Sequence, residues 1–201
     1  YTTTAETGYG IRQSDPHYFY EMSLDLGLLH AAGWDGSAFN IQWTENCAND
    51  SIIVDPGMTD ISAEVELIIS EEGLKPVAAL LTHGHLDHTF SVKPLADGYG
   101  ISAYIHSEDR RFIADPAGIH GAQFVDQLRG MEFEEPKEVK TLKDGSLLDF
   151  VGLSLRAIHA PGHTRGSLMF LLNEEILISG DVLFAGSIGR TDLPTGSASD
   201  M

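Results

Sequence analysis

The sequence predicts a layered α/β domain, and three observations support this class. Apolar patterns typical of a strand, a helix and a second strand follow one another between residues 51 and 82. From Leu147 onward, three or four short strand patterns succeed one another, as they do in an antiparallel meander. The chain has 201 residues, of which 42% are hydrophobic and 21% are charged, so it can form one domain with a buried core.

The elements at the front of the chain follow from the spacing of their apolar residues. Residues 39–43 alternate between apolar and polar side chains, which predicts a strand with one buried face. Residues 51–57 predict a short buried strand that ends in an Asp-Pro-Gly turn. Residues 60–72 change to helical spacing, and we expect Asp60 to be the N-cap of this helix and Gly73 to lie just past its end.

The middle of the chain continues the succession of predicted strands and helices. A continuous apolar strand over residues 77–82 runs directly into a polar segment, 83–88. A further strand is predicted over 101–105 and a helix over 107–113, whereas residues 115–145 show no clear pattern.

The back of the chain is predicted to form strands over residues 153–158, 167–172 and 176–179. Asn173 and Glu174 are expected to make the hairpin turn between the last two of these strands. We assign residues 41–201 to one domain. Residues 1–40 are an N-terminal segment that we expect to join its first sheet.

The charge of the chain narrows the classes of partner. Its 12 Lys and Arg residues against 30 Asp and Glu residues give a formal net charge of −18. Such a field repels nucleic acid and anionic membranes, so neither is an expected partner, but it attracts metal cations. No run approaches the ~18 apolar residues that a membrane helix needs. The single cysteine, Cys47, excludes a disulfide framework within the chain, is expected in the core or a loop, and favours a reducing, cytoplasmic location.

A dense cluster of histidines follows the strand predicted over residues 77–82. His83, His85 and His88 lie within six residues, with Asp87 among them. Imidazole and carboxylate groups suit zinc, and also iron or manganese. In extended backbone, His83 and His85 project to the same side and can hold one ion, while Asp87 and His88 turn toward a second ion close by.

Two other predicted strand ends carry ligand-type residues. His163 lies in a glycine-rich turn that follows one strand, and Asp181 follows another. Each signal is weak alone, because ordinary turns contain such residues. Since ligand sites in α/β domains form at strand ends, the three loops together predict one metal centre.

Several motifs carry a resemblance to a known family, and they lie at residues 53–57, 82–88, 160–164, 179–181 and 182–194. With these motifs the sequence resembles the metallo-β-lactamase fold superfamily, and most of all its glyoxalase II-like (hydroxyacylglutathione hydrolase-like) branch. The last motif is similar to short bacterial members of that branch. The resemblance covers residues 45–200. It implies the αββα sandwich of the superfamily, here lacking its C-terminal strand and helices.

The resemblance also implies two metal ions, with zinc expected and iron or manganese as alternatives. His83, His85 and His163 would hold the first ion, Asp87 and His88 would hold the second, and Asp181 would bridge both. A further histidine of the family's second site lies in a Gly-His-Gly-like motif beyond the last residue of this sequence, so we expect the second site to be weak. The remaining histidines considered, His106, His120 and His159, are expected to be structural or surface residues, with His159 a candidate for supporting the ligands.

The reaction implied by the resemblance is hydrolysis of a thioester, with a small hydroxyacyl thioester as the expected substrate. A hydroxide that bridges the metals would attack the carbonyl carbon, and Asp87 would orient it. Arg190 is a candidate for contact with the substrate, and a salt bridge to Asp192 is the alternative. The sequence does not indicate the oligomeric state.

Other activities of the same fold are also considered. The sulfur dioxygenase branch uses a single iron, which His83, His163 and Asp181 would hold here. An inert or metal-binding fragment without activity is a further alternative. A β-lactamase is less favoured, because residues 179–181 lack the cysteine that several such enzymes place there, and a nuclease is disfavoured by the net charge.

Overall fold

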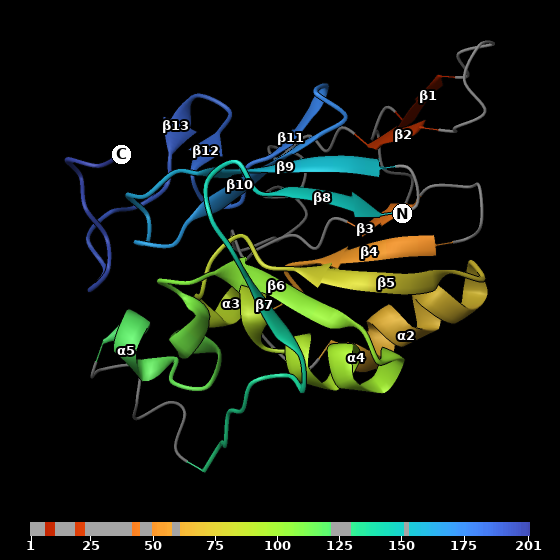
Figure 1. Cartoon of the computed structure of the whole chain (residues 1–201), viewed down its shortest axis with the longest axis horizontal. Helices are drawn as coiled ribbons and strands as arrows, with labels where there is room; N and C mark the ends of the chain where they lie inside the picture. Colours follow the sequence, from red (N-terminus) through yellow and green to blue (C-terminus); the bar gives the residue numbers. More distant parts are fainter. Residues whose placement is uncertain are drawn as a thin grey trace, which may run out of the picture.

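The computed structural model describes residues 7–10, 19–22, 42–44, 50–57, 61–121, 130–150 and 153–201. Two sheets lie one above the other, and helices cover the outer face of the larger sheet (Figure 1). The layered α/β class predicted from the sequence is therefore confirmed. Among the described residues, no helix has both the length and the apolar character needed to cross a membrane.

The larger sheet is mainly parallel. Its strands, in spatial order, are β3 (Gln42–Thr44), β4 (Asp50–Val54), β5 (Lys75–Leu80), β6 (Ser102–His106) and β7 (Val139–Leu142). β3 runs antiparallel to β4, and the other neighbours are parallel. The carboxyl ends of β4, β5 and β6 therefore lie at one edge of the sheet, where loops from three strands can meet.

The smaller sheet is antiparallel throughout. Its strands, in spatial order, are β11 (Ile176–Ile178), β10 (Leu168–Leu172), β9 (Leu153–His159) and β8 (Leu147–Phe150). Two further ribbons pair β1 (Thr7–Gly10) with β2 (Phe19–Met22) and β12 (Leu183–Phe184) with β13 (Ser187–Ile188). The division of the chain at residue 40 stays a prediction, because most of residues 1–40 lie outside the described ranges.

The helices are short and join the strands of the larger sheet. They are α2 (Ser62–Glu71), α3 (Leu86–Thr89), α4 (Val92–Tyr99), the 3-10 helix η1 (Arg110–Ile113) and α5 (Ala117–His120). In Figure 1, α2 and α4 lie beneath β4 to β6, on the face away from the smaller sheet. This arrangement leaves α3 and η1 close to the carboxyl ends of the strands.

Side-chain alternation along the strands divides the core into two layers. Ile52 and Leu80 face the smaller sheet and pack with its Leu155 and Phe170, all of them nearly fully buried. Ile53 and Leu81 point the other way. They pack against the helices with a second set of buried residues, which includes Ile69, Val92 and Leu95. Successive side chains of a strand point to opposite faces of the sheet, so a strand contributes to both core layers only when both of its faces are buried. This explains the continuous apolar run in β5.

The strand predicted over residues 77–82 begins earlier than expected, since β5 starts at Lys75 and includes Pro76. The pairing of β4 with β5 shifts by one residue here, because Ser51 pairs with Pro76 and Ile52 with Ala78. The pairing of β5 with β6 starts only at Ala78. Proline cannot donate to a ladder, so its place in a central strand depends on this irregularity.

Two helix predictions need correction. The helix expected over residues 107–113 is only the 3-10 turn η1, because the N–H of Asp109 bonds back to His106 and that of Phe112 bonds back to Asp109. The N-cap of α2 is Ile61 and not Asp60. The N–H of Ile61 donates to Ser91 Oγ at 3.0 Å, so a tertiary contact replaces the expected local cap.

The structure also bears on predictions for two turns and for the segment without a clear pattern. Asn173 and Glu174 form the turn between β10 and β11, and both have positive φ values, 49° and 57°. Gly73 follows α2 with φ 63°. The segment 115–145, which gave no pattern, contains α5 and β7. Asp60 and Cys47 lie outside the described residues, as do residues 39–41 of the first predicted strand.

Candidate metal centre

The predicted ligands gather where the two sheets end. His83 and His85 follow β5, His163 lies in the turn after β9, and Asp181 follows β11. The three histidines are almost completely buried. Residues separated by up to 98 positions in the chain are thus brought to one place by the topology of the sheets.

A first ligand group consists of His83, His85 and His163, whose ligand atoms all lie within 4.8 Å of one another. His163 Nε2 is 2.8 Å from His85 Nδ1 and 3.2 Å from His83 Nε2. Three converging imidazole nitrogens are the donor set that zinc and related metals prefer.

A second ligand group consists of His83, His88 and Asp181, also within 4.8 Å. The Nε2 atom of His88 lies 3.5 Å from Asp181 Oδ1 and 3.7 Å from Asp87 Oδ2. The other Asp181 oxygen, Oδ2, lies 3.6 Å from His163 Nε2. Asp181 therefore faces both groups, and Asp87 approaches the second group through His88.

Hydrogen bonds determine which ring nitrogen of His83 and of His163 bears the proton. His163 Nδ1 lies 2.7 Å from the carbonyl oxygen of Arg190, so Nδ1–H donates. Thr82 Oγ1 donates to Asp55 at 2.7 Å, and therefore accepts from His83 Nδ1 at 3.0 Å. In the neutral rings both Nε2 atoms then present lone pairs to each other. Such an arrangement is unfavourable alone and is satisfied by a cation, so the residues present fit a metal ion.

His88 is fixed by the same buried carboxylate. Its Nδ1 lies 3.0 Å from Asp55 Oδ2. Its Nε2 is buried and has no hydrogen-bond partner among the described residues. Burial lowers the pKa of His88, but the charge and hydrogen bond of Asp55, with Asp87 and Asp181, outweigh burial and raise the pKa to about 9. A metal ion at Nε2 must therefore displace a proton as it binds.

Burial keeps His83 and His85 in the form that binds metals. Burial, with the neighbouring His88, lowers the pKa of His83 well below its ordinary value. Burial, with His163 and His120, lowers the pKa of His85 to about 2. Burial also raises the pKa of Asp181. Neutral imidazole is the ligand form, so two histidines are ready for a metal without loss of a proton.

Three residues beside the ligands were given no part in the centre by the sequence prediction. Asp55 follows β4, accepts the Thr82 N–H at 2.8 Å, and has a φ of 46°, which is unusual for a residue with a side chain. Asp109 follows β6 and is completely buried. His120 of α5 accepts the N–H of Leu86 at 2.8 Å. The link between the two aspartates and the centre depends on the sheet order, because Asp55 and Asp109 follow the two strands that neighbour β5.

The other histidines differ in their surroundings. The ring of His120 lies 4.8 Å from that of His85, so this residue is beside the centre and not on a remote surface. His106 and His159 stack on each other with ring centroids 4.0 Å apart. His159 Nε2 also contacts the carbonyl oxygen of Arg165 in the loop that carries His163.

Arg190 contributes to the centre through its main chain, by the contact of its carbonyl with His163. Its guanidinium makes two 2.8 Å hydrogen bonds to Asp192, and 60% of the side chain is exposed. The salt bridge considered from the sequence is therefore present, and the guanidinium still faces solvent.

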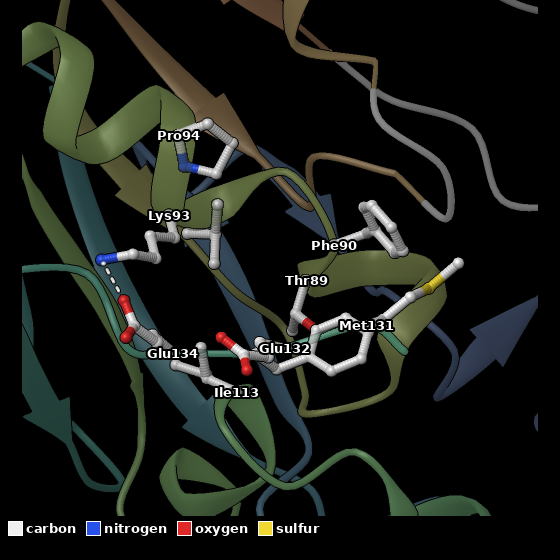
Figure 2. Close-up of a pocket in the computed structure, with 10 residues that line it drawn as sticks. Thr89, Phe90, Lys93, Pro94, Ile113, Met131, Glu132 and Glu134 are labelled. Carbon is white, nitrogen blue, oxygen red and sulfur yellow. Dashed lines mark ion pairs between the residues drawn. The ribbon is translucent and has the colours of Figure 1, made fainter. Parts of the chain in front are cut away.

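A separate cavity of about 420 Å³ lies between α4 and residues 131–134. Figure 2 shows its aromatic and aliphatic lining, with Lys93 paired to Glu134 at 3.3 Å. No member of either ligand group lines this cavity, so it is distinct from the candidate metal centre.

Curated relatives cover most of the chain. An uncharacterized protein of Mycobacterium leprae is 41% identical over 160 residues, which are 78% of this chain and 73% of the relative. The probable metallo-hydrolase YqgX of Bacillus subtilis is 34% identical over 73% of this chain and 67% of its own length. The hydroxyacylglutathione hydrolase GloC of Haemophilus influenzae is 32% identical over 76% and 73%.

Solved structures agree with the architecture. The BLEG-1 B3 metallo-beta-lactamase is 31% identical, with a TM-score of 0.65 over 81% of each chain. TTHA1623, in a di-iron-bound form, is 27% identical, with a TM-score of 0.63 over 81% of each chain. The αββα sandwich class predicted from the sequence is confirmed by this likeness. Residues 45–201 match the family model described as the metallo-beta-lactamase superfamily, and the chain therefore belongs to this superfamily.

Proposed function

We propose that this chain is a metal-dependent hydrolase that cleaves a small hydroxyacyl thioester. Members of its superfamily are hydrolases or related enzymes. The observation that carries the proposal is the convergence of two ligand groups on the shared residue His83. The choice of a thioester draws support from the relative GloC, whose name states hydroxyacylglutathione hydrolase activity.

His83, His85 and His163 would hold the first metal ion, Asp87 and His88 would hold the second, and Asp181, which faces both groups, would contribute to both. When bound, the metals would polarise the substrate carbonyl and lower the pKa of a shared water. The protein holds the imidazoles in place through Asp55, Thr82 and the Arg190 carbonyl.

Asp87 is proposed to orient the attacking water. Its side chain is 32% exposed, whereas that of neighbouring His88 is only 5% exposed, so Asp87 is the more accessible of the two. A carboxylate at this position can accept a hydrogen bond from the water and direct its lone pair. A thiolate leaves readily without a proton, so cleavage of a thioester needs little help from an acidic side chain.

Arg190 is proposed to contact the substrate. Its exposed guanidinium lies next to a main-chain contact with His163. Substitution of Arg190 by Gln should raise KM by several-fold with little change in kcat, since the substrate contact is made equally in the ground state and the transition state. An unchanged KM would limit Arg190 to its bond with Asp192.

Zinc is the proposed metal, and iron is the main alternative. The similar structure TTHA1623 is described in a di-iron-bound form. A single-iron sulfur dioxygenase would use His83, His163 and Asp181. Oxygen uptake with a persulfide and one iron per chain would replace the hydrolase proposal. The expected location is cytoplasmic and the expected partners are small molecules, without nucleic acid or membranes, and cell fractionation would check the location.

The test measures purified protein with a lactoyl thioester, a β-lactam and a phosphodiester, alongside elemental analysis. We expect the thioester to be hydrolysed much faster than the other two, and chelation to remove the activity. A Glu174→Gln variant serves as the control, because Glu174 is exposed and pairs with Arg156, away from both ligand groups. Equal rates on the β-lactam and the thioester, or a protein that binds no metal, would contradict the proposal.

A further inference from the structure

Among the described residues outside the two ligand groups, Asp109 has, like Asp55, a buried carboxylate that accepts three hydrogen bonds. The residue follows β6 and has no exposed surface. Its Oδ2 accepts the Gly84 N–H at 2.9 Å and the Thr164 hydroxyl at 2.6 Å. Its Oδ1 accepts the Gly166 N–H at 2.8 Å. All three partners are donors, which matches an ionised carboxylate that can only accept.

The donors come from the two loops that supply the first ligand group. Gly84 lies between His83 and His85, in the loop after β5. Thr164 follows His163, in the loop between β9 and β10. The two loops extend from different sheets, so one carboxylate ties the sheets together beside the converging imidazoles.

The close approach of Asp109 requires glycine at position 166 and leaves little space for a side chain at position 84. A Cβ on Gly166 would lie 2.6 Å from Asp109 Oδ1, which is closer than real Cβ atoms come. A Cβ on Gly84 would lie 3.0 Å from the Asp109 carbonyl oxygen. In each loop, Asp109 therefore occupies space that a side chain would otherwise fill. This close fit indicates that the contact is specific.

We infer that Asp109 is a positioning residue that sets the distance between the His83–His85 loop and the His163 loop, and so the geometry of the first ligand group. The inference rests on the metal-binding part of the proposed function. It does not depend on which substrate is hydrolysed. The imidazole nitrogens lie only 2.8 and 3.2 Å apart across the two loops, so a small change in loop separation alters the site.

The test uses Asp109→Asn, which keeps the size of the side chain. One amide orientation leaves the NH2 facing the Gly166 N–H, and the other leaves it facing the Gly84 N–H, so a donor always meets a donor. We expect first-site zinc affinity to fall about 10–100-fold, the range typical when groups that support metal ligands are removed. The visible spectrum of bound Co²⁺ should change as well. Asp149→Asn, the same change at an exposed position, should alter neither.

A purely structural role would give a different result. Ile69→Ala removes buried packing at the helical layer, away from both loops, and should lower the unfolding temperature without changing zinc affinity. If Asp109→Asn behaves like Ile69→Ala, with lower stability and an unchanged Co²⁺ spectrum, the inference is overturned. Because these readouts use metal alone, absence of thioester hydrolysis in the unmodified protein would count against the proposed function and not against Asp109.

A milder pair of variants covers the case in which Asp109→Asn does not fold. Thr164→Val removes one hydroxyl bond to Asp109, and Thr164→Ser retains it. Weaker zinc binding in the valine variant with recovery in the serine variant would support the inference. Equal zinc affinities in both would contradict it, since the hydroxyl would then have no influence on the ligand loops.

Discussion

The two ligand groups share His83 but differ in their surroundings. The first group is made of three imidazoles, and all three residues are buried. The second group includes Asp181, whose side chain is 29% exposed, and lies next to Asp87, which is 32% exposed. The first group is thus enclosed, whereas the second lies on the side that is open to solvent. Under the proposed function, the first group would retain metal and the second would be reached by the reactants.

The groups also share a support. Asp55 accepts from Thr82, which in turn contacts His83, and it lies 3.0 Å from His88. The first group has additional contacts through Asp109 that the second lacks among the described residues. The difference between the enclosed first group and the open second group can therefore be tested in two ways. One substitutes residues that both groups share, and the other substitutes residues that belong to one group alone.

The largest effect is expected from His83→Ala, because Nε2 of His83 would bind the first ion and also lies beside the second group. The first ion should be lost, with a fall in affinity greater than the about 10–100-fold typical of losing a supporting group, and the second ion should bind more weakly. Hydrolytic activity should disappear with the first ion. Elemental analysis after gel filtration measures the loss, with Glu174→Gln as control. Normal metal content in His83→Ala would show that the centre is formed elsewhere.

The next largest effect separates the two groups. Calorimetric titration of the metal-free chain should show one tight site and one weak site, since only the first group is fully buried. Asp181→Ala should abolish the weak site and lower the affinity of the tight one much less, because three imidazoles remain. Two equally tight sites in the unmodified chain would remove the basis of the comparison.

Asp55→Asn should weaken both groups together. An amide cannot accept from all three donors that meet the carboxylate, so either Thr82 or His88 loses its correct partner. We expect a loss of about 10–100-fold in the affinity of each site. Parallel titrations of Asp55→Asn and Asp149→Asn measure it. A loss confined to one site would mean that Asp55 supports only that group.

The smallest effect is expected from His120→Ala, which removes the acceptor of the Leu86 N–H at the start of α3. The helix carries Asp87 and His88, so the second site should weaken. A lost hydrogen bond of about 1 kcal/mol corresponds to roughly a five-fold change in affinity. His120→Gln, whose amide oxygen can accept the same N–H, should restore part of it. A stronger effect on the first site than on the second would contradict this assignment.

Much of the fold was predictable because it depends on local patterns. The apolar runs of β4, β5, β9 and β10 predicted strands at the right places, and the turn at Asn173 and Glu174 was identified from its residues. β7 was missed, because its pattern of exposed and buried residues does not alternate and only Leu142 is buried. The N-cap of α2 was missed because its partner, Ser91, lies in a different part of the chain.

The candidate metal centre likewise has a part that the sequence predicted and a part that it did not. The motif residues could be named from the sequence, since histidines that cluster directly after a buried strand are typical of a metal site. The supports could not be named with equal ease. Asp109 is one of 30 acidic residues, and nothing local distinguishes it from those that face solvent. Only the parallel order of β4, β5 and β6 brings Asp55 and Asp109 to either side of the histidine loop.

The shift in pairing between β4 and β5 has a consequence for how this chain tolerates insertions and deletions. Val77 is the additional residue on β5 at that point, because Ser51 and Ile52 are consecutive whereas their partners Pro76 and Ala78 are not. Deletion of Val77 would make the two partners consecutive as well, so the ladder would become regular. Ala78 would keep its partner and its place toward the smaller sheet, and His83 would keep its side. The irregularity can therefore absorb the loss of one residue without changing where the histidines point.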